Sequence, residues 1–293
     1  MKPLNANELL DLETTDPSPI WGPTICSHNL VMVYGGTGIG KTYVCMKLAH
    51  TISAGGVWLQ WGCINPKRVL YIDGELGLSA IKRRFKAIQA EAAYFPRGDY
   101  FRVLSKDHCG PRLWNISDPA DQKKYNEAIG NSEVVVFDNL LSCVFPMHSR
   151  DDDVKQWERI LPWFHALRDT GRTVIVVHHT GKSGAQLGTS VKENWLDTNI
   201  ELRLPLSSRP VRGTEFEWRF KKTRDVKRSD AQNMLVTYAE DEDGVSRWMW
   251  SPLNNAQTDV VRDLKAQGAT RREVAKQTGL SFKEVNDAWE VNV

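Results

Sequence analysis

The glycine-rich stretch "GGTGIGKT" at residues 35–42 is the feature that most constrains how this chain folds. It matches the pattern G-x-x-x-x-G-K-[ST] through Gly35, Gly40, Lys41 and Thr42. The apolar run "NLVMVY" precedes it, and a helix-forming segment follows. Glycine is unfavourable inside helices, so its concentration here indicates a loop with backbone conformations or close approaches that only glycine allows. A strand, such a loop and a helix in succession are typical of a phosphate-binding loop.

The chemistry of a bound triphosphate explains the spacing within this loop. Backbone N–H groups point inward around the phosphates, and the following helix contributes free N–H groups and its dipole. Lys41 is expected to reach the β- and γ-phosphates, and the Thr42 hydroxyl is expected to ligate Mg²⁺. The predicted nucleotide-binding residues are Gly35, Gly36, Thr37, Gly38, Ile39, Gly40, Lys41 and Thr42. A glycine-rich turn without a ligand is the alternative.

Four short apolar runs are continuous and rich in β-branched residues, as strands buried on both faces are. They lie at residues 29–34, 68–73, 133–138 and 173–179. Helical patterns separate them, at residues 42–54, 78–93 and 151–170. This alternation predicts an α/β fold in which helices flank a mostly parallel sheet. After residue 198 the pattern changes to short segments that look more antiparallel, at residues 199–204, 215–221, 234–238 and 246–250.

The bulk composition narrows the class of protein. A chain of 293 residues is long enough for one large α/β domain with a small appendage. Its net charge is only +2, so any nucleic-acid surface must come from local clustering. The five cysteines stand singly without a C-x-x-C pair, which favours a reduced, cytoplasmic protein. The N-terminal segment lacks a signal-type apolar core, and no apolar run reaches about 18 residues, so neither secretion nor membrane spanning is expected.

Two acidic residues stand where parallel strands are expected to end. Asp138 closes the run "VVVFD", where a carboxylate that ligates Mg²⁺ belongs. The next residue, Asn139, cannot take a proton, so the carboxylate that activates water must come from elsewhere. Glu75, in "YIDGEL" after the second strand, is the candidate for that role. The alternatives are a turn-forming Asp138 and a helix-capping Glu75.

Four motifs, in their order and spacing, resemble the RecA-like P-loop ATPases: "GGTGIGKT", "YIDGE", "VVVFDN" and "VIVVHHTGKSG". The resemblance is strongest to the AAA_25 branch, which includes the plasmid-borne RepA-type hexameric replicative helicases. It covers about residues 15–250. It implies a RecA-type core, ATP with Mg²⁺ as cofactors, and a homo-oligomeric ring, expected to be a hexamer, or a filament with nucleotide at subunit interfaces. It also implies that Glu75 activates water.

A pair of histidines, His178 and His179, ends the fourth expected strand. A polar group there can contact both a γ-phosphate and the next loop, and so report the nucleotide state. In RecA-like helicases this position is the sensor at the head of a DNA-binding loop. The resemblance transfers that role to His179 first and to His178 second. Two ordinary histidines at a strand end are the alternative.

The segment at residues 180–195, "TGKSGAQLGTSVKENW", follows these histidines and is rich in glycine and hydroxyl residues. In the resembling family, the equivalent loop lines the central channel and holds single-stranded DNA. Lys182 and Lys192 would then contact the phosphates of the DNA backbone. Because glycine- and serine-rich stretches are often plain linkers, a flexible loop without this role is the alternative.

Positive charge is concentrated between residues 203 and 228, where nine Lys/Arg face three Asp/Glu, a local excess of +6. A P-loop site in a ring lies at the subunit edge, where a cation of the neighbour can stabilise transition-state charge. DnaB-like helicases carry a similar K-x-R at the end of a strand after the core. Lys222 and Arg224 match it and are the candidate trans-acting fingers, with Arg203 or Arg212 as alternatives. The alternative is a solvent-exposed edge strand whose charges prevent pairing with other chains.

The composition divides the chain into two predicted domains. Residues 1–252 would form the ATPase domain, and residues 258–293 a small three-helix domain with helix-turn-helix spacing. The polar segment 251–257, "SPLNNAQ", is predicted to be the linker between them.

Two capping boxes, Thr270 with Glu273 and Ser281 with Glu284, mark expected helix starts in the small domain. Its six Lys/Arg are balanced by six Asp/Glu, and the would-be recognition helix is net acidic. Because an acidic helix repels DNA phosphates, binding of DNA and binding of protein both remain open for this domain.

The leading functional hypothesis is an oligomeric, ATP-hydrolysing motor on single-stranded DNA, resembling RepA-like replicative helicases of mobile elements. A RecA/RadA-like DNA-handling or loader ATPase without unwinding is the second. A KaiC-like regulatory ATPase that does not bind nucleic acid is the third. A nucleotide-binding interaction protein without useful turnover is the fourth. The basic segment and the loop at 180–195 favour the DNA hypotheses.

Overall fold

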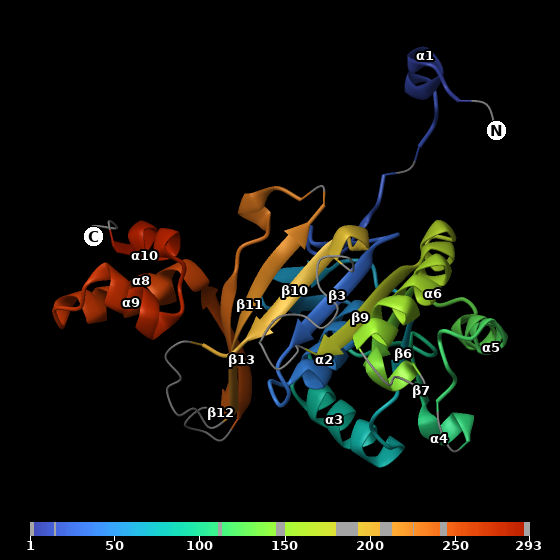
Figure 1. Ribbon diagram of the computed structural model, residues 1–293. Helices are drawn as coiled ribbons and strands as arrows, with labels where there is room; N and C mark the ends of the chain where they lie inside the picture. Colours follow the sequence, from blue (N-terminus) through green and yellow to red (C-terminus); the bar gives the residue numbers. More distant parts are fainter. Residues whose placement is uncertain are drawn as a thin grey trace.

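The computed structural model describes residues 3–14, 16–110, 113–144, 150–179, 193–205, 213–224, 226–240 and 245–289. Its centre is a mixed β-sheet. The parallel strands are β3 (Leu30–Gly35), β6 (Val69–Asp73), β7 (Phe101–Ser105), β8 (Val134–Asp138), β9 (Thr173–His179) and β10 (Thr198–Arg203). The antiparallel strands are β11 (Gly213–Thr223), β12 (Met234–Glu240) and β13 (Ser246–Pro252). Within the described residues, the strand order is β13-β12-β11-β10-β3-β9-β8-β6-β7 (Figure 1). The predicted α/β fold with a mostly parallel sheet is therefore confirmed.

The transition from parallel to antiparallel pairing occurs at β10. This strand was expected to be antiparallel, but it runs parallel to β3, with Thr198 opposite Val31 and Leu202 opposite Gly35. On its other side it pairs antiparallel with β11. The expectation was wrong for β10 because the alternation in "NIELRL" reflects a polar and an apolar face of the strand. Such alternation does not determine the direction in which the strand runs.

Helices cover both faces of the parallel part. Helices α2 (Lys41–Ala54) and α3 (Leu78–Ala90) lie on one face, and α5 (Pro119–Ile129) and α6 (Arg150–Asp169) lie on the other. Successive residues of β3 point to opposite faces, so Val31 and Val33 join the core under α2, and Leu30 and Met32 join the core under α6. Among the described helices, none combines the length and apolar character that crossing a membrane requires.

Several elements were not predicted. Edge strand β7 and helix α5 lie between two of the predicted strands, and α5 begins with Asp118 as its N-cap and Pro119 in its first turn. The remaining short elements are α1 (Ala6–Leu10), β1 (Pro19–Trp21), β2 (Ile25–Cys26), β4 (Gly56–Trp58), β5 (Trp61–Cys63), α4 (Lys106–Cys109), η1 (Leu141–Cys143) and η2 (Arg228–Asp230). Of these, η1 follows β8 and helps to shape the site described below.

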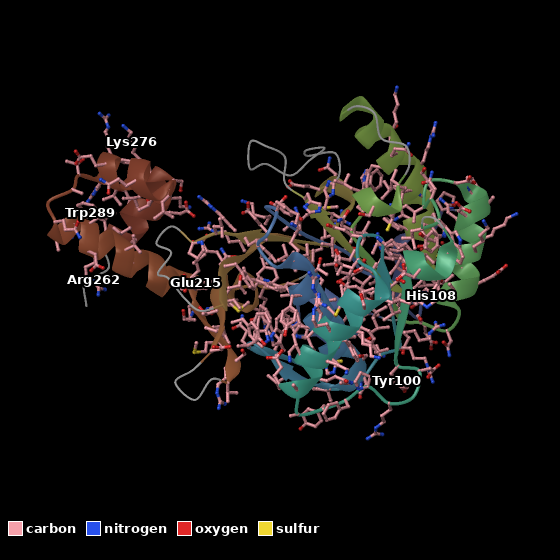
Figure 2. All side chains as sticks on the ribbon, turned by 90° about the horizontal axis from the view of Figure 1, so that it is seen from below. Tyr100, His108, Glu215, Arg262, Lys276 and Trp289 are labelled. Atoms are coloured by element: carbon pink, nitrogen blue, oxygen red, sulfur yellow. The ribbon has the colours of Figure 1, made fainter. Side chains whose placement is uncertain are left out.

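Three helices form a unit at the β13 edge of the sheet: α8 (Leu253–Ala266), α9 (Arg271–Thr278) and α10 (Phe282–Trp289). They pack around a small core of Val261, Val274, Leu280 and Val285. Figure 2 places Arg262, Lys276 and Trp289 on this unit, and Tyr100 and His108 at the opposite side of the molecule. The linker prediction for residues 251–257 is wrong, because β13 ends at Pro252 and α8 begins at the next residue, the buried Leu253. The division at residues 252 and 258 stays a prediction.

Both predicted capping boxes are present. The Thr270 backbone N–H donates to Glu273, and the Ser281 backbone N–H donates to Glu284, over 2.8 Å in each case. Glu284 also lies 3.4 Å from the guanidinium of Arg219, a buried residue of β11. The start of α10, the would-be recognition helix, is therefore tied to the sheet.

Candidate functional site

The carboxyl ends of four parallel strands, β3, β9, β8 and β6, lie next to one another at one end of the sheet. The end of β3 lies beside the end of β9, with Gly35 opposite His179. The end of β6 lies beside the end of β8, with Asp73 opposite Asp138. A cavity of about 260 Å³ opens there, and it is lined by Thr37, Gly38, Gly40, Lys41, Thr42, Tyr43, Glu75, Arg84, Asp138, Asn139 and His179. Eight predicted site residues thus come together from four separate segments of the chain: Thr37, Gly38, Gly40, Lys41, Thr42, Glu75, Asp138 and His179.

The glycines of the loop at 35–42 have identifiable structural roles. Gly38 and Gly40 have φ angles of 82° and 92°, in the left-handed region that favours glycine. A Cβ atom on Gly35 would lie 2.4 Å from the carbonyl oxygen of Leu202, so the close approach of β10 requires glycine at this position. The loop therefore combines left-handed turns with a tight strand contact.

Lys41 is buried at the first turn of α2. Its Nζ donates to the carbonyl oxygens of Gly35, at 3.0 Å, and Gly36, at 2.7 Å. Burial lowers the pKa of the Lys41 ammonium, while the Asp138 carboxylate works in the opposite direction. The Lys41 ammonium is thus held inside the phosphate-binding loop. The backbone that holds it is the one expected to surround a bound phosphate.

Asp138 and Thr42 place two oxygen ligands side by side. Asp138 is only 2% exposed, and its Oδ2 accepts a hydrogen bond of 2.6 Å from the Tyr71 hydroxyl. Burial raises the pKa of Asp138, and hydrogen bonds from Tyr71 and Thr42 oppose that shift. Among the described residues, no group of three or more His, Cys, Asp or Glu side chains is arranged to hold a metal. A hydroxyl and one carboxylate, with nucleotide phosphates and water, match how Mg²⁺ is bound in proteins.

Glu75 and His179 meet through Asn139. The Asn139 Nδ2 donates to Glu75 Oε2 over 2.7 Å and lies 3.1 Å from His179 Nε2. Burial lowers the pKa of His179, and the Lys41 ammonium lowers it further. The neutral imidazole is therefore favoured near pH 7. The sequence pointed to Glu75 and His179, but it gave Asn139 no role beyond lacking a proton-accepting group.

Asp73 holds the backbone that carries Glu75. Its Oδ1 accepts hydrogen bonds from the backbone N–H of Glu75, at 2.9 Å, and of Leu76, at 2.6 Å. The following residue, Gly74, allows close packing, since a Cβ there would lie 2.7 Å from the Cβ of Ser142. Burial raises the pKa of Asp73 to about 7. Sequence reasoning missed Asp73, although an Asp-Gly pair directly after a strand is a turn signal.

Replacing Asp73 by Asn is expected to stabilise the protein more at pH 8 than at pH 5. Because the folded pKa, about 7, lies above the ordinary value of 3.8, wild-type stability falls as pH rises between these values and levels off above them. Asn keeps the acceptor oxygen and removes the buried charge. Thermal unfolding should show a Tm gain of roughly 5 °C at pH 8 and a smaller gain at pH 5. The matched control, Asp169→Asn at an exposed position, should show the same small difference at both pH values; an equal gain for both variants would contradict the argument.

Lys222 and Arg224 are not part of this cavity. Lys222 lies opposite Asn199 near the beginning of β10, beside the first residues of β3, whereas the phosphate-binding loop follows the last residue of β3. An irregularity in the β10–β11 register between Phe220 and Lys222 changes the pairing just before these cations. The two candidate fingers therefore lie at the end of the sheet away from the phosphate-binding loop of their own chain.

Both side chains are held at the start of β10. Lys222 Nζ donates to the carbonyl oxygens of Glu193, at 2.6 Å, and Asn194, at 3.2 Å. Arg224 Nη2 donates to the Asn194 carbonyl at 2.7 Å, and its Nη1 lies 3.6 Å from Asp197 Oδ1. Burial and the Arg224 guanidinium lower the pKa of Lys222. The cations thus contact Glu193 and Asn194, the two residues that directly follow Lys192.

The remaining predicted residues have different outcomes. Arg203 lies opposite Glu217 at the end of β10, at the same end of the sheet as the phosphate-binding loop. His178 is buried at the end of β9, beside Tyr34 of β3. Lys182, Lys192 and Arg212 lie outside the described residues.

Besides Asn139, two cavity residues were missed from the sequence. Arg84 reaches the cavity from α3, and nothing in its basic neighbourhood separates it from the exposed Lys82 and Arg83. Tyr43 follows Thr42, and its ring lies 5.4 Å from the Tyr238 ring of β12. Tyr43 lines the cavity from the first turn of α2, and its hydroxyl donates to that of Tyr238 over 3.2 Å.

Comparisons with known proteins agree with this geometry. Residues 1–185 match the family model AAA_25, an AAA domain. The structure resembles that of a KaiC-like protein of the hyperthermophilic archaeon Pyrococcus horikoshii OT3, with a TM-score of 0.54 and 12% identity, over 78% of this chain and 91% of the other. At this identity the likeness concerns the fold, and it confirms the expected RecA-like core. No curated protein matches the sequence.

Proposed function

Since this chain belongs to the AAA_25 family of AAA domains and is a P-loop ATPase with a RecA-like fold, we propose that it is an oligomeric motor on single-stranded DNA. A RepA-like replicative helicase is the specific form of this proposal. The observation that carries it is the placement of Lys222 and Arg224 at the end of the sheet opposite the phosphate-binding loop. Cations at that end of the strands lie away from the nucleotide cavity of their own chain, and in this proposal they contact the nucleotide of a neighbouring subunit.

Five residues of the cavity have roles in the proposed hydrolysis. Lys41 binds the β- and γ-phosphates, and Thr42 with Asp138 holds Mg²⁺, which when bound neutralises phosphate charge. Glu75 accepts the proton of the attacking water. His179, between the cavity and the following loop, responds to the nucleotide state.

In this proposal the neighbouring subunit completes the site. Its Lys222 and Arg224 stabilise the charge that develops on the γ-phosphoryl group. A ring or filament of identical chains brings such a pair to every nucleotide, and a hexameric ring is the form expected of a RepA-like protein. The oligomer is therefore part of the mechanism, because an isolated chain lacks these two cations at its own cavity.

The proposed DNA contacts are Lys182 and Lys192, whose phosphate attraction depends on salt. Support comes from the described end of their segment. The carbonyl oxygens of Glu193 and Asn194 are hydrogen-bonded by the two candidate fingers. If Lys222 and Arg224 contacted a neighbour's nucleotide, their hydrogen bonds to Glu193 and Asn194 would change. That change would occur directly after the proposed DNA-binding segment.

Single-stranded DNA is expected to stimulate ATP hydrolysis by the wild-type protein several-fold at low salt. The Lys182→Ala/Lys192→Ala variant should lose the stimulation and keep the basal rate, because in this proposal the two lysines bind DNA phosphates and not the nucleotide. A matched control is Lys123→Ala/Lys124→Ala, which removes two exposed lysines of α5. Steady-state ATPase rates with and without an oligonucleotide, at two salt concentrations, provide the measurement. Equal rates with and without DNA would contradict the DNA-motor proposal.

A second candidate function is a regulatory ATPase that does not bind nucleic acid. The likeness in fold to a KaiC-like protein favours it. It predicts ATP hydrolysis that is insensitive to DNA but still sensitive to loss of Arg224. The DNA-stimulation experiment therefore separates the two functions.

A further inference from the structure

We propose that Asn139 is a positioning residue that couples the catalytic carboxylate, Glu75, to the sensor, His179. This inference rests on the proposed roles of those two residues. Asn139 is 3% exposed and sits directly after the Mg²⁺ carboxylate, Asp138, where β8 ends. Its side-chain amide is the one group within hydrogen-bond distance of both partners among the described residues.

The orientation of the Asn139 amide follows from its oxygen. Oδ1 accepts hydrogen bonds from the Ser142 backbone N–H, at 3.0 Å, and from the Ser142 hydroxyl, at 3.1 Å. These donors face the carbonyl side, so the NH₂ group must face the cavity. The backbone around Asn139 is held as well, because Leu140 N–H donates to the Val177 carbonyl of β9 over 2.8 Å. The amide is therefore fixed between two strands of the sheet.

The NH₂ group has two hydrogens and two neighbours. One hydrogen is donated to Glu75 Oε2 at 2.7 Å, and the other points to His179 Nε2 at 3.1 Å. Since an amide nitrogen only donates, Nε2 must be the unprotonated nitrogen of the neutral ring, and the proton lies on Nδ1. Asn139 thus selects the tautomer of the sensor and holds one oxygen of the carboxylate.

Asparagine is the residue type that this position requires. An aspartate would keep the acceptor for Ser142 but would present a negative charge, with no donor, to Glu75. An alanine would leave Glu75 without the contact that orients it. In the proposed reaction, Asn139 holds Oε2 while Oε1 takes the proton of water. When His179 turns toward a phosphate, the Asn139 amide loses its hydrogen bond to His179. The amide is then less firmly held, and the orientation of Glu75 changes with it.

The test compares Asn139→Asp and Asn139→Ala with wild type by steady-state ATPase kinetics. We expect kcat to fall at least about tenfold in both variants, with KM for ATP within about twofold, because nucleotide binding does not use the amide. Binding of a fluorescent ATP analogue and a thermal melt show that each variant is folded. Ser142→Ala is the matched control. It keeps the backbone donor to Oδ1, so its kcat should stay within about threefold of wild type.

A double-variant cycle tests whether Asn139 acts through Glu75. In the Glu75→Gln background, Asn139→Ala should lower kcat by less than about twofold, because the carboxylate that Asn139 positions is already lost. An undiminished effect in that background, or a kcat within about twofold of wild type in the single variants, would overturn the inference. Full activity of Glu75→Gln alone would instead refute the proposed catalytic role of Glu75. The two failures are therefore distinguishable.

Discussion

Replacing Arg224 by Ala in every subunit is expected to lower kcat for ATP hydrolysis by roughly 10³- to 10⁵-fold, as for other arginines supplied in trans. ATP binding should persist, because Arg224 lies at the end of the sheet away from its own phosphate-binding loop. Steady-state kinetics with a parallel nucleotide-binding assay measure both quantities. Arg203→Ala is the informative comparison, since Arg203 lies at the same end of the sheet as the loop. Inactivity of Arg203→Ala beside an active Arg224→Ala would move the finger assignment to Arg203.

Mixing subunits shows whether Arg224 acts between chains. Arg224→Ala subunits keep an intact phosphate-binding loop, and Lys41→Ala subunits keep an intact Arg224. Each variant alone should be nearly inactive, and mixed oligomers should recover part of the wild-type rate, because some interfaces combine the two intact halves. If no ratio of the variants restores activity, Arg224 acts within its own chain or has no catalytic role.

Replacing Glu75 by Gln is expected to lower kcat by roughly 10²- to 10⁴-fold, the range of a general base. The amide keeps the shape of the side chain and an acceptor for Asn139 but cannot take the proton of water. KM for ATP should change little, so the loss lies in the chemical step. Single-turnover ATP hydrolysis measures that step directly. The control Glu127→Gln, at an exposed position of α5, should behave as wild type.

Full single-turnover activity of Glu75→Gln would remove Glu75 from the mechanism. Another carboxylate of the cavity region would then have to take the proton. Asp73 is the nearest alternative in sequence, but both hydrogen bonds to its Oδ1 come from the backbone of the turn that follows it. A structural role for Asp73 is therefore expected to persist in either case.

The parts of the fold that depend on local sequence were predicted well. The expected strand at residues 173–179 coincides with Thr173–His179, and the expected helix at 42–54 differs from Lys41–Ala54 by one residue. Glycine-specific conformations and continuous apolar runs are local properties, so they are visible in the sequence. Edge strand β7 was missed because "FRVLS" is short and only its last two residues are buried.

The sequence identified individual residues of the candidate site but not the hydrogen bonds that join them. Lys41, Thr42, Glu75, Asp138 and His179 each stand at a strand end or loop that the sequence identifies. Asn139 also follows such a strand end, but its role could not be predicted, because its partners, Glu75 and His179, are 64 and 40 residues away along the chain. In this chain the contacts arise because parallel strands place their carboxyl ends at one end of the sheet.

The sequence by itself determined that a phosphate-binding loop follows a buried strand, and that two acids and a histidine end neighbouring strands. These features follow from residue type and short-range pattern. Only the tertiary structure decided that Asn139 joins Glu75 to His179, and that Lys222 and Arg224 lie away from their own phosphate-binding loop. The physical reason is that β10 runs parallel to β3 while β11 returns antiparallel, which places the basic end of β11 at the opposite end of the sheet.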